Sequence, residues 1–418
     1  MKFNHRSTVR TIGESGRRGP AGRPGAAAGF TLIELVISVG IMSMIMGGTM
    51  MALAQAARAN ETALLVTSMN NGLRTGMDMM IRDMLQVGSG LPPGHSIQIP
   101  CCSTRVNLPG PPGPTRQTSL GDTEIYAVMQ GTRLGPLVNQ NGTTTCTVEG
   151  PDCVKTDTLL TIAADSTFRD VPLKARDAAG TWIDVALKGL DNIAGNADDI
   201  NIATGPDRVV PGQLIMLEKG SYTVLLQVTD VNGVTGRIYF ADGDSLALNK
   251  HTANSGSVAG TNGLNNWAPA PDVVPETTPV VRTTLHTTAT RVRMITYYID
   301  ATDPVHPKLV RRLNNGHQTT FNNNSGSVVA FDVENLKISF DMADGKTNPA
   351  NVTFVPADYV AGGPCDGADC SPTQVRKVTI TLTGRSKKKL TGLNRFFHNT
   401  LTTQVALRGM AFVNDYVQ

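Results

Sequence analysis

The chain has 418 residues and a formal net charge of +3, with 40% hydrophobic, 17% charged and 5% aromatic residues. This length and apolar fraction allow a sizeable core and exclude wholesale disorder. The charge is uneven, because residues 1–29 carry six basic side chains against Glu14, which is +5, so the remainder is 3 − 5 = −2. A body so close to neutral predicts no general electrostatic attraction to nucleic acid.

The first predicted elements are a basic leader, residues 1–29, and an apolar helix, residues 30–57. Residues 35–57 are 23 positions without a charged side chain, which as a helix span about 34 Å and can cross a bilayer core. The basic leader holds its end in the cytoplasm, so everything after Arg58 is expected on the far side of the membrane. An ordinary secretory signal fits poorly, since the small residues 26–29 precede the apolar run.

The junction between leader and helix carries the most specific signal in the chain. Gly29 is followed by Phe-Thr-Leu-Ile-Glu, ending at Glu34, and then by the uncharged run. This order closely resembles the processing motif of type IV prepilins. The resemblance implies that a prepilin peptidase cleaves between Gly29 and Phe30, that Phe30 is then N-methylated, and that Glu34 is the assembly carboxylate. A plain transmembrane anchor with an incidental Glu, and a twin-arginine signal at Arg17 and Arg18, are the alternatives.

Beyond the apolar run, the helix is expected to continue over residues 58–87 as its exported part. Apolar side chains recur three to four positions apart at Leu65, Met69, Leu73, Met77, Met80 and Met84. This spacing predicts one buried helix face, while the charged ladder of Arg74, Asp78 and Arg82 lies on another. The Gly- and Pro-rich residues 88–93 end the helix.

Residues 88–418 are predicted to form a β-rich head, which makes the fold class α+β: a long N-terminal helix followed by a large antiparallel sheet. Strand-like runs are expected at residues 123–129, 157–163, 213–218, 222–229, 235–240, 291–300, 308–313, 328–331, 335–340, 374–383 and 402–408. Val378, Ile380 and Leu382 alternate with polar residues and predict one buried sheet face.

Other stretches of the head are expected to lack regular structure. Residues 91–120 are rich in Pro and Gly, which predicts a semi-rigid loop. Residues 231–233 are typical of a turn between strands. Residues 241–290, rich in Thr, Asn, Ala and Pro, predict an irregular surface excursion.

The later strand-like runs, from Met294 to Arg408, resemble in their order the blocks of PilW-type minor pilins and of the J-type pseudopilins of type II secretion. The family pattern usually closes with Arg-Asn, whereas Gly409 follows Arg408 here. The extended middle, residues 130–290, has no counterpart in this resemblance and is interpreted as an insertion. A head of this size would be hard to repeat at every position of a filament, so bulk and resemblance together imply a minor or tip-located subunit.

Six cysteines are candidates for disulfide bonds, namely Cys101, Cys102, Cys146, Cys153, Cys365 and Cys370. Their spacing lacks the repeated two-residue gaps of a structural zinc site. An exported head favours disulfide-closed loops over free thiols. The connectivity stays open, because six cysteines allow about 15 pairings.

Two acidic loops are candidate calcium sites, because Asp and Asn at near-alternate positions supply the oxygen ligands that calcium needs. The candidate ligands are Asp191, Asn196, Asp198 and Asp199 in the first loop and Asp242 and Asp244 in the second. Neither loop follows the EF-hand pattern, and the same residues are common turn formers.

Residues 385–389, with Arg395 and His398 nearby, form a basic cluster that can be interpreted as a nucleic-acid patch or as a solvated hairpin loop. The seven histidines are scattered, and none pairs with Asp or Glu at a catalytic or metal-binding spacing. The sequence also lacks a nucleophile elbow, a Walker loop and a dinucleotide fingerprint. We therefore expect no enzymatic activity.

The hypothesis implied by the resemblance is a prepilin of the bacterial inner membrane that joins a type IV pilus as a minor subunit and primes or caps its assembly. Its expected partners are other pilins, through the helix from Phe30, the prepilin peptidase and the assembly platform of the inner membrane. The head is expected in the periplasm before assembly and on the cell surface afterwards. A pseudopilin of type II secretion shares every motif. A membrane-tethered adhesin and an anchored hydrolase are the alternatives from other classes.

Overall fold

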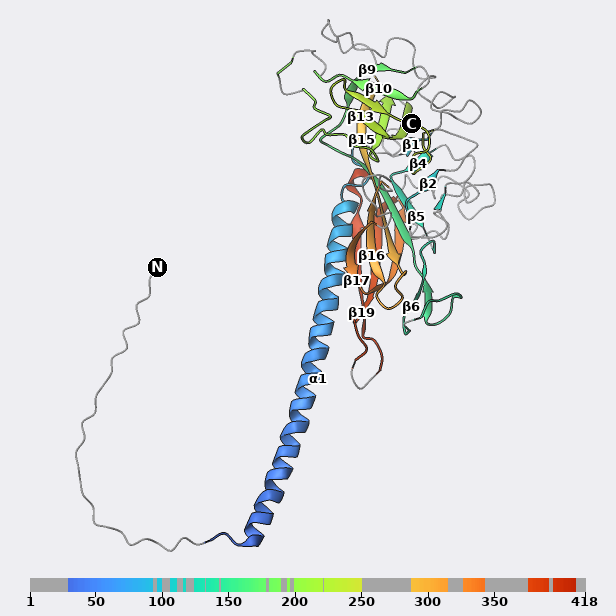
Figure 1. The fold of residues 1–418 in the computed structure, drawn as a ribbon. Helices are drawn as coiled ribbons and strands as arrows, with labels where there is room; N and C mark the ends of the chain where they lie inside the picture. The colour runs from blue at the N-terminus through green and yellow to red at the C-terminus, as the bar shows by residue number, and fades with distance from the viewer. Residues whose placement is uncertain are drawn as a thin grey trace, which may run out of the picture. The chain divides into compact units, whose positions relative to one another are not determined.

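The computed structural model describes residues 29–92, 96–99, 106–110, 116–117, 124–131, 133–142, 144–177, 180–188, 194–195, 199–220, 222–249, 287–314, 326–342, 375–390 and 394–410. The chain consists of two compact units, Met1–Asn60 and Glu61–Gln418. Within these described residues there is one α-helix, α1 (Leu32–Met84), and an antiparallel, sheet-rich region follows it in the chain (Figure 1). The α+β fold class is therefore confirmed.

In the described part of the chain, eleven strands form the main sheet, and their pairings are all antiparallel. They are β5 (Val128–Gly131), β8 (Thr158–Ala164), β9 (Val171–Arg176), β10 (Trp182–Val185), β11 (Leu214–Lys219), β12 (Tyr222–Gln227), β13 (Asp230–Asn232), β14 (Arg237–Tyr239), β15 (Thr288–Asp300), β16 (Lys308–Leu313) and β17 (Ser327–Phe331). β15 is the longest and pairs with β8, β9, β11 and β16 at successive parts of its length. It therefore joins most of the sheet.

The remaining strands form smaller sheets. They are the three-stranded sheet of β18 (Val333–Met342), β19 (Val375–Arg385) and β20 (His398–Ala406), and the pairs β1 (Ser96–Gln98) with β4 (Glu124–Tyr126), β2 (Asn107–Leu108) with β3 (Arg116–Gln117), and β6 (Leu137–Asn139) with β7 (Cys153–Lys155). A short 3-10 helix, η5 (Arg408–Met410), follows β20. The strands expected near residues 157–163, 213–218, 308–313 and 374–383 are confirmed to within two residues at each end.

The second half of α1 packs against sheet through the apolar face that its periodicity predicts. Met69, Leu73, Met77, Met80 and Met84 are buried in one cluster with the inward side chains of β18 and β19. The helix lies so close to its neighbours that a Cβ on Gly76 would stand 3.1 Å from Leu309 and 3.3 Å from Ala330. The charged ladder on the other face is exposed, as expected.

The loop expected over residues 91–120 is wrong where the structure describes it. β1, β2 and β3 lie in this range, and Ile97, Ile99, Val106 and Leu108 are buried in an apolar cluster with β8, β11 and β15. The sequence could not predict these strands, because strands of two or three residues are too short to show an alternation of apolar and polar side chains.

The surface excursion expected at residues 241–290 is wrong at both ends. Leu246, Leu248 and Asn249 are buried, and β15 begins at Thr288; residues 250–286 lie outside the described part. The turn expected at residues 231–233 begins later, since β13 includes Asn232. Apart from the β6–β7 pair, the described strands between residues 130 and 290 belong to the main sheet, in which β8 and β11 both pair with β15.

A buried ion-pair network follows β8. Asp165 accepts hydrogen bonds from Arg291 Nε at 2.9 Å, Arg293 Nη2 at 2.6 Å and the Thr167 backbone N–H at 3.1 Å. Burial raises the pKa of Asp165, but the hydrogen bonds from Thr167 and Arg293 and the charge of Arg291 outweigh this effect and lower the pKa to about 2.

The lowered pKa of Asp165 predicts a loss of stability in acid. The carboxylate contributes fully above its unfolded-state pKa, and its contribution disappears as the pH falls through about 2. We expect the stability difference between wild type and Asp165→Asn to shrink by about 2 kcal/mol between pH 5 and pH 2. Denaturant unfolding of the detergent-solubilised protein across this range measures it, and a difference that does not change with pH would contradict the network's role.

Candidate functional site

The residues predicted as a processing site lie in an open position before α1. Gly29 and Phe30 precede the helix, both are exposed, and the Phe30 side chain has 83% of its surface accessible. A Cβ added to Gly29 would meet nothing within 4 Å. The peptide bond between the two residues is therefore sterically accessible.

The first turn of α1 is closed by a reciprocal cap between Thr31 and Glu34. The Glu34 carboxylate accepts the Thr31 backbone N–H at 3.0 Å and its hydroxyl at 2.9 Å, and Glu34 N–H donates to Thr31 Oγ1 at 3.3 Å. This arrangement is a capping box, and it satisfies donors that a helix start leaves free. The Thr-x-x-Glu spacing is itself a sequence signal for this cap.

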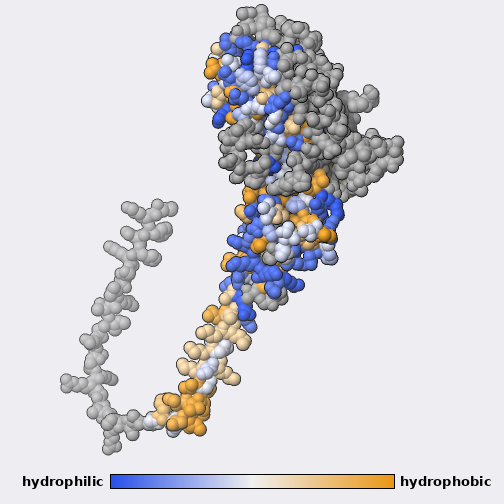
Figure 2. All heavy atoms as spheres, turned by 45° about the vertical axis from the view of Figure 1, so that its right-hand side comes forward, coloured by the Kyte–Doolittle hydropathy of each residue, from blue (hydrophilic) through white to orange (hydrophobic). Residues whose placement is uncertain are grey.

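Every described residue of α1 up to Asn60 is exposed, although most of this part is apolar. Figure 2 shows this part of the helix mainly in the colours of hydrophobic residues. Its most apolar window has a mean hydropathy of 1.9, and by length and composition it is a candidate membrane span. An exposed apolar surface this extended is typical of a segment covered by lipid or by other helices.

At the other end of α1, the Asp83 side chain forms hydrogen bonds with the main sheet. Its carboxylate accepts hydrogen bonds from Arg311 Nε at 2.6 Å and Nη2 at 3.2 Å, on β16, and from the Tyr297 hydroxyl at 2.5 Å, on β15. Burial and the Asp83 charge raise the pKa of Tyr297. The phenol therefore stays protonated and donates to the carboxylate.

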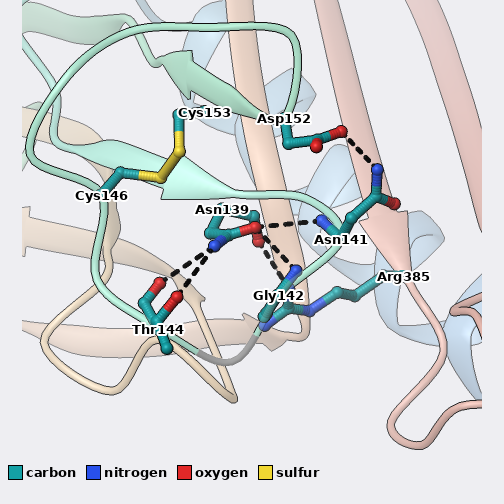
Figure 3. The surroundings of a disulfide bond; sticks show 8 residues. All are labelled: Asn139, Asn141, Gly142, Thr144, Cys146, Asp152, Cys153 and Arg385. Atoms are coloured by element: carbon teal, nitrogen blue, oxygen red, sulfur yellow. Dashed lines mark hydrogen bonds between the residues drawn. A yellow bond between two sulfur atoms is a disulfide. The ribbon is translucent and has the colours of Figure 1, made fainter.

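A disulfide joins Cys146 to Cys153 beside the β6–β7 hairpin (Figure 3). Within the hairpin loop, the side-chain Oδ1 of Asn139 accepts the backbone N–H of Asn141 at 3.2 Å and that of Gly142 at 2.6 Å. The two cysteines are seven positions apart in the sequence. This pair is one of the three that the sequence places close together.

The Arg385 side chain holds the same hairpin from the opposite side (Figure 3). Its guanidinium donates to the carbonyl oxygens of Asn139 at 2.8 Å and Gly142 at 3.3 Å, and to those of Pro304 at 2.5 Å and Val305 at 2.8 Å. Arg385 is fully buried, so its assignment to a basic surface cluster was wrong. The three lysines that follow it, residues 387–389, are exposed.

The structure gives no support to the calcium loops where it describes them. Three of the candidate calcium ligands lie outside the described residues, namely Asp191, Asn196 and Asp198. The same holds for four of the disulfide candidates, Cys101, Cys102, Cys365 and Cys370. Asp199 Oδ2 accepts the Gly195 backbone N–H at 2.6 Å, and Asp244 accepts those of Leu248 and Asn249 at 2.8 and 2.9 Å. Among the described residues, no group of three or more His, Cys, Asp or Glu side chains is arranged to hold a metal ion.

The fold brings together two histidine–carboxylate pairs that sequence spacing could not predict. His306 Nδ1 lies 2.7 Å from Asp332 Oδ1, and His398 Nδ1 lies 2.8 Å from Glu334 Oε1. The two members of a pair are 26 residues apart in the sequence in the first case and 64 in the second. The four residues lie at or within two positions of the first residues of β16, β18 and β20.

Comparisons of the chain with protein-family models, with curated protein sequences and with solved structures find no match.

Proposed function

We propose that this protein is a minor subunit of a type IV pilus, cleaved between Gly29 and Phe30 and assembled through α1. The observation that carries the proposal is the exposed apolar helix that begins directly after the Gly-Phe junction and bears a carboxylate, Glu34, in its first turn. Its second half packs on an antiparallel sheet, which supports the pilin-like arrangement of a helix with a β-rich head.

The chemistry of the helix start supports assembly through charge. After cleavage, the new amino group of Phe30 would carry a positive charge four residues before Glu34. Among apolar helices, a carboxylate is poorly solvated and attracts an opposite charge strongly. The Glu34 carboxylate can also accept a hydrogen bond from the ammonium group of a neighbouring subunit. A carboxylate has about four acceptor positions, and the contacts with Thr31 involve only one of its oxygens.

The capping box supplies a sharp test of this role. Gln keeps the capping geometry but has no charge, so Glu34→Gln separates helix capping from charge pairing. We expect both Glu34→Gln and Glu34→Ala to lower the amount of the protein in sheared filaments by about tenfold or more, since about 1.4 kcal/mol of lost attraction already gives a factor of ten. Both variants should still enter the membrane and lose residues 1–29, as intact mass and the N-terminal residue would reveal.

Glu61→Ala is the matched control, because Glu61 is an exposed carboxylate of the same helix. It should enter filaments at the wild-type level. Normal incorporation of Glu34→Gln would contradict the charge role and leave Glu34 as a helix cap alone. A mature protein that retains residues 1–29, in cells with an active prepilin peptidase, would overturn the proposed function.

A further inference from the structure

A cavity of 420 Å³ lies between the disulfide-closed hairpin and the outer face of the three-stranded sheet. Lys337, Ser339 and Thr379 on β18 and β19 line one side, and Glu149 and Lys155 from the hairpin line another. Ser339 stands opposite Thr379 in the strand register, so the two side chains project from the same face. Protein cavities that bind small molecules are commonly about 300–1,000 Å³.

The charges around the cavity favour an anion. Three cationic side chains, Arg133, Lys155 and Lys337, face two carboxylates, those of Glu149 and Asp157, which leaves an excess of one positive charge. Both carboxylates are already engaged, Glu149 with the Arg133 guanidinium and Asp157 with two backbone N–H groups at 2.8 and 3.0 Å. Burial raises the pKa of Asp157, and the nearby charge of Lys337 counteracts this only in part. Neither lysine ammonium has a salt bridge within the described part of the chain.

The cavity adjoins a sheet face lined with hydroxyl groups. Thr379, Thr381 and Thr383 alternate along β19, and Thr381 and Thr383 form hydroxyl contacts of 3.1 and 3.0 Å with Thr402 and Thr400 on β20. The Ser339 and Thr379 hydroxyls have no side-chain partner among the described residues. Hydroxyl and ammonium groups in one row suit a ligand that carries both hydroxyls and an anionic group.

We propose that this cavity binds an acidic saccharide, with its anionic group at Lys155 and Lys337 and its hydroxyls at Ser339 and Thr379. Val154 and Ile338 are the apolar residues of the lining, and its other residues carry a hydroxyl or a charged group. Polar contacts are therefore expected to determine which ligand is recognised. A sugar carboxylate and a sugar sulfate share the required chemistry. The cavity lies wholly within Glu61–Gln418, so the inference does not rest on filament assembly.

The disulfide supports one wall of this site. Glu149 lies in the loop closed by Cys146 and Cys153, and Lys155 follows Cys153 by two residues. Opening the disulfide would release the start of β7, which positions the Lys155 ammonium group for the anionic part of the ligand. Reduction is therefore expected to weaken ligand binding.

Calorimetry on the full-length protein in detergent tests the site with three probes: a trigalacturonate, a sulfated disaccharide and a neutral trisaccharide. We expect an acidic probe to bind, the neutral one to bind at least about tenfold more weakly, and Lys337→Ala to lower the acidic probe's affinity by about tenfold. The carboxylate and sulfate arms identify the anionic group. Lys377→Ala is the matched control, because Lys377 is an exposed β19 lysine outside the cavity.

Equal binding of neutral and acidic probes, or no binding of any probe, would overturn the inference. An equal effect of Lys377→Ala and Lys337→Ala would do so too, because it would reduce the effect to general surface charge. A Cys146→Ser and Cys153→Ser double variant should bind the acidic probe more weakly than wild type, and addition of a reductant should have no further effect on it.

Discussion

Replacement of Arg385 by Met is expected to lower the free energy of unfolding by about 3–5 kcal/mol. The buried guanidinium donates to four carbonyl oxygens in two separate loops and lies 4.7 Å from the centre of the Phe396 ring. Met fills a similar length but donates no hydrogen bond, so these carbonyls would lose their donor inside the protein. Urea unfolding of the detergent-solubilised chain measures the change.

Lys387→Met is the matched control for this prediction. Lys387 is exposed and lies two residues after Arg385, so its replacement should change stability by less than about 0.5 kcal/mol. Arg385→Lys should fall between the two, because an ammonium group has fewer donors than the guanidinium. A loss below about 1 kcal/mol for Arg385→Met would mean that water replaces the guanidinium at these carbonyls.

Asp83→Ala is expected to destabilise the head by about 2–4 kcal/mol. The change leaves the Arg311 guanidinium without its carboxylate and the buried Tyr297 hydroxyl without its acceptor. Burial lowers the pKa of Arg311, while the Asp83 carboxylate raises it and prevails. Because Asp83 lies at the last turn of α1, the second half of the helix should exchange its backbone amides faster as well.

Asp78→Ala provides the comparison, because Asp78 is an exposed carboxylate on the same helix. It should leave both the unfolding free energy and the amide exchange of residues 69–84 close to wild type. Equal destabilisation by the two variants would show that the effect comes from helix charge, and that the contacts to β15 and β16 contribute little.

Local patterns in the sequence predicted the elements that carry their own periodicity. The buried stripe of α1 follows from apolar residues at helical spacing, and the inward face of β19 follows from the alternation of Val378, Ile380 and Leu382. The same alternation places Arg385 on the outward face together with Thr383. That face is covered there by the hairpin at Asn139 and the loop at Pro304. Such a covering depends on residues far away in the sequence, so the local charge density was misleading.

The candidate functional residues also differ in whether they are close together in the sequence. The Gly29–Phe30 junction and Glu34 are contiguous, so a local motif is enough to single them out. The cavity could not be predicted, because Lys155 and Lys337 come from strands 182 residues apart (337 − 155) and only the fold brings them together. Asp83 and Arg311 are likewise separated by 228 residues.

The central place of β15 has a consequence for how the chain reaches its native state. β8 and β11 both pair with β15, yet β15 begins only at Thr288. During synthesis, these two strands emerge well before their common partner. Each can pair with a strand made before β15, namely β5 or β12, but the backbone groups on the edge that will face β15 stay unpaired. Pairing over such long sequence distances makes folding slow and the waiting strands prone to aggregation. Completion of the main sheet therefore depends on the synthesis of one thirteen-residue strand, β15.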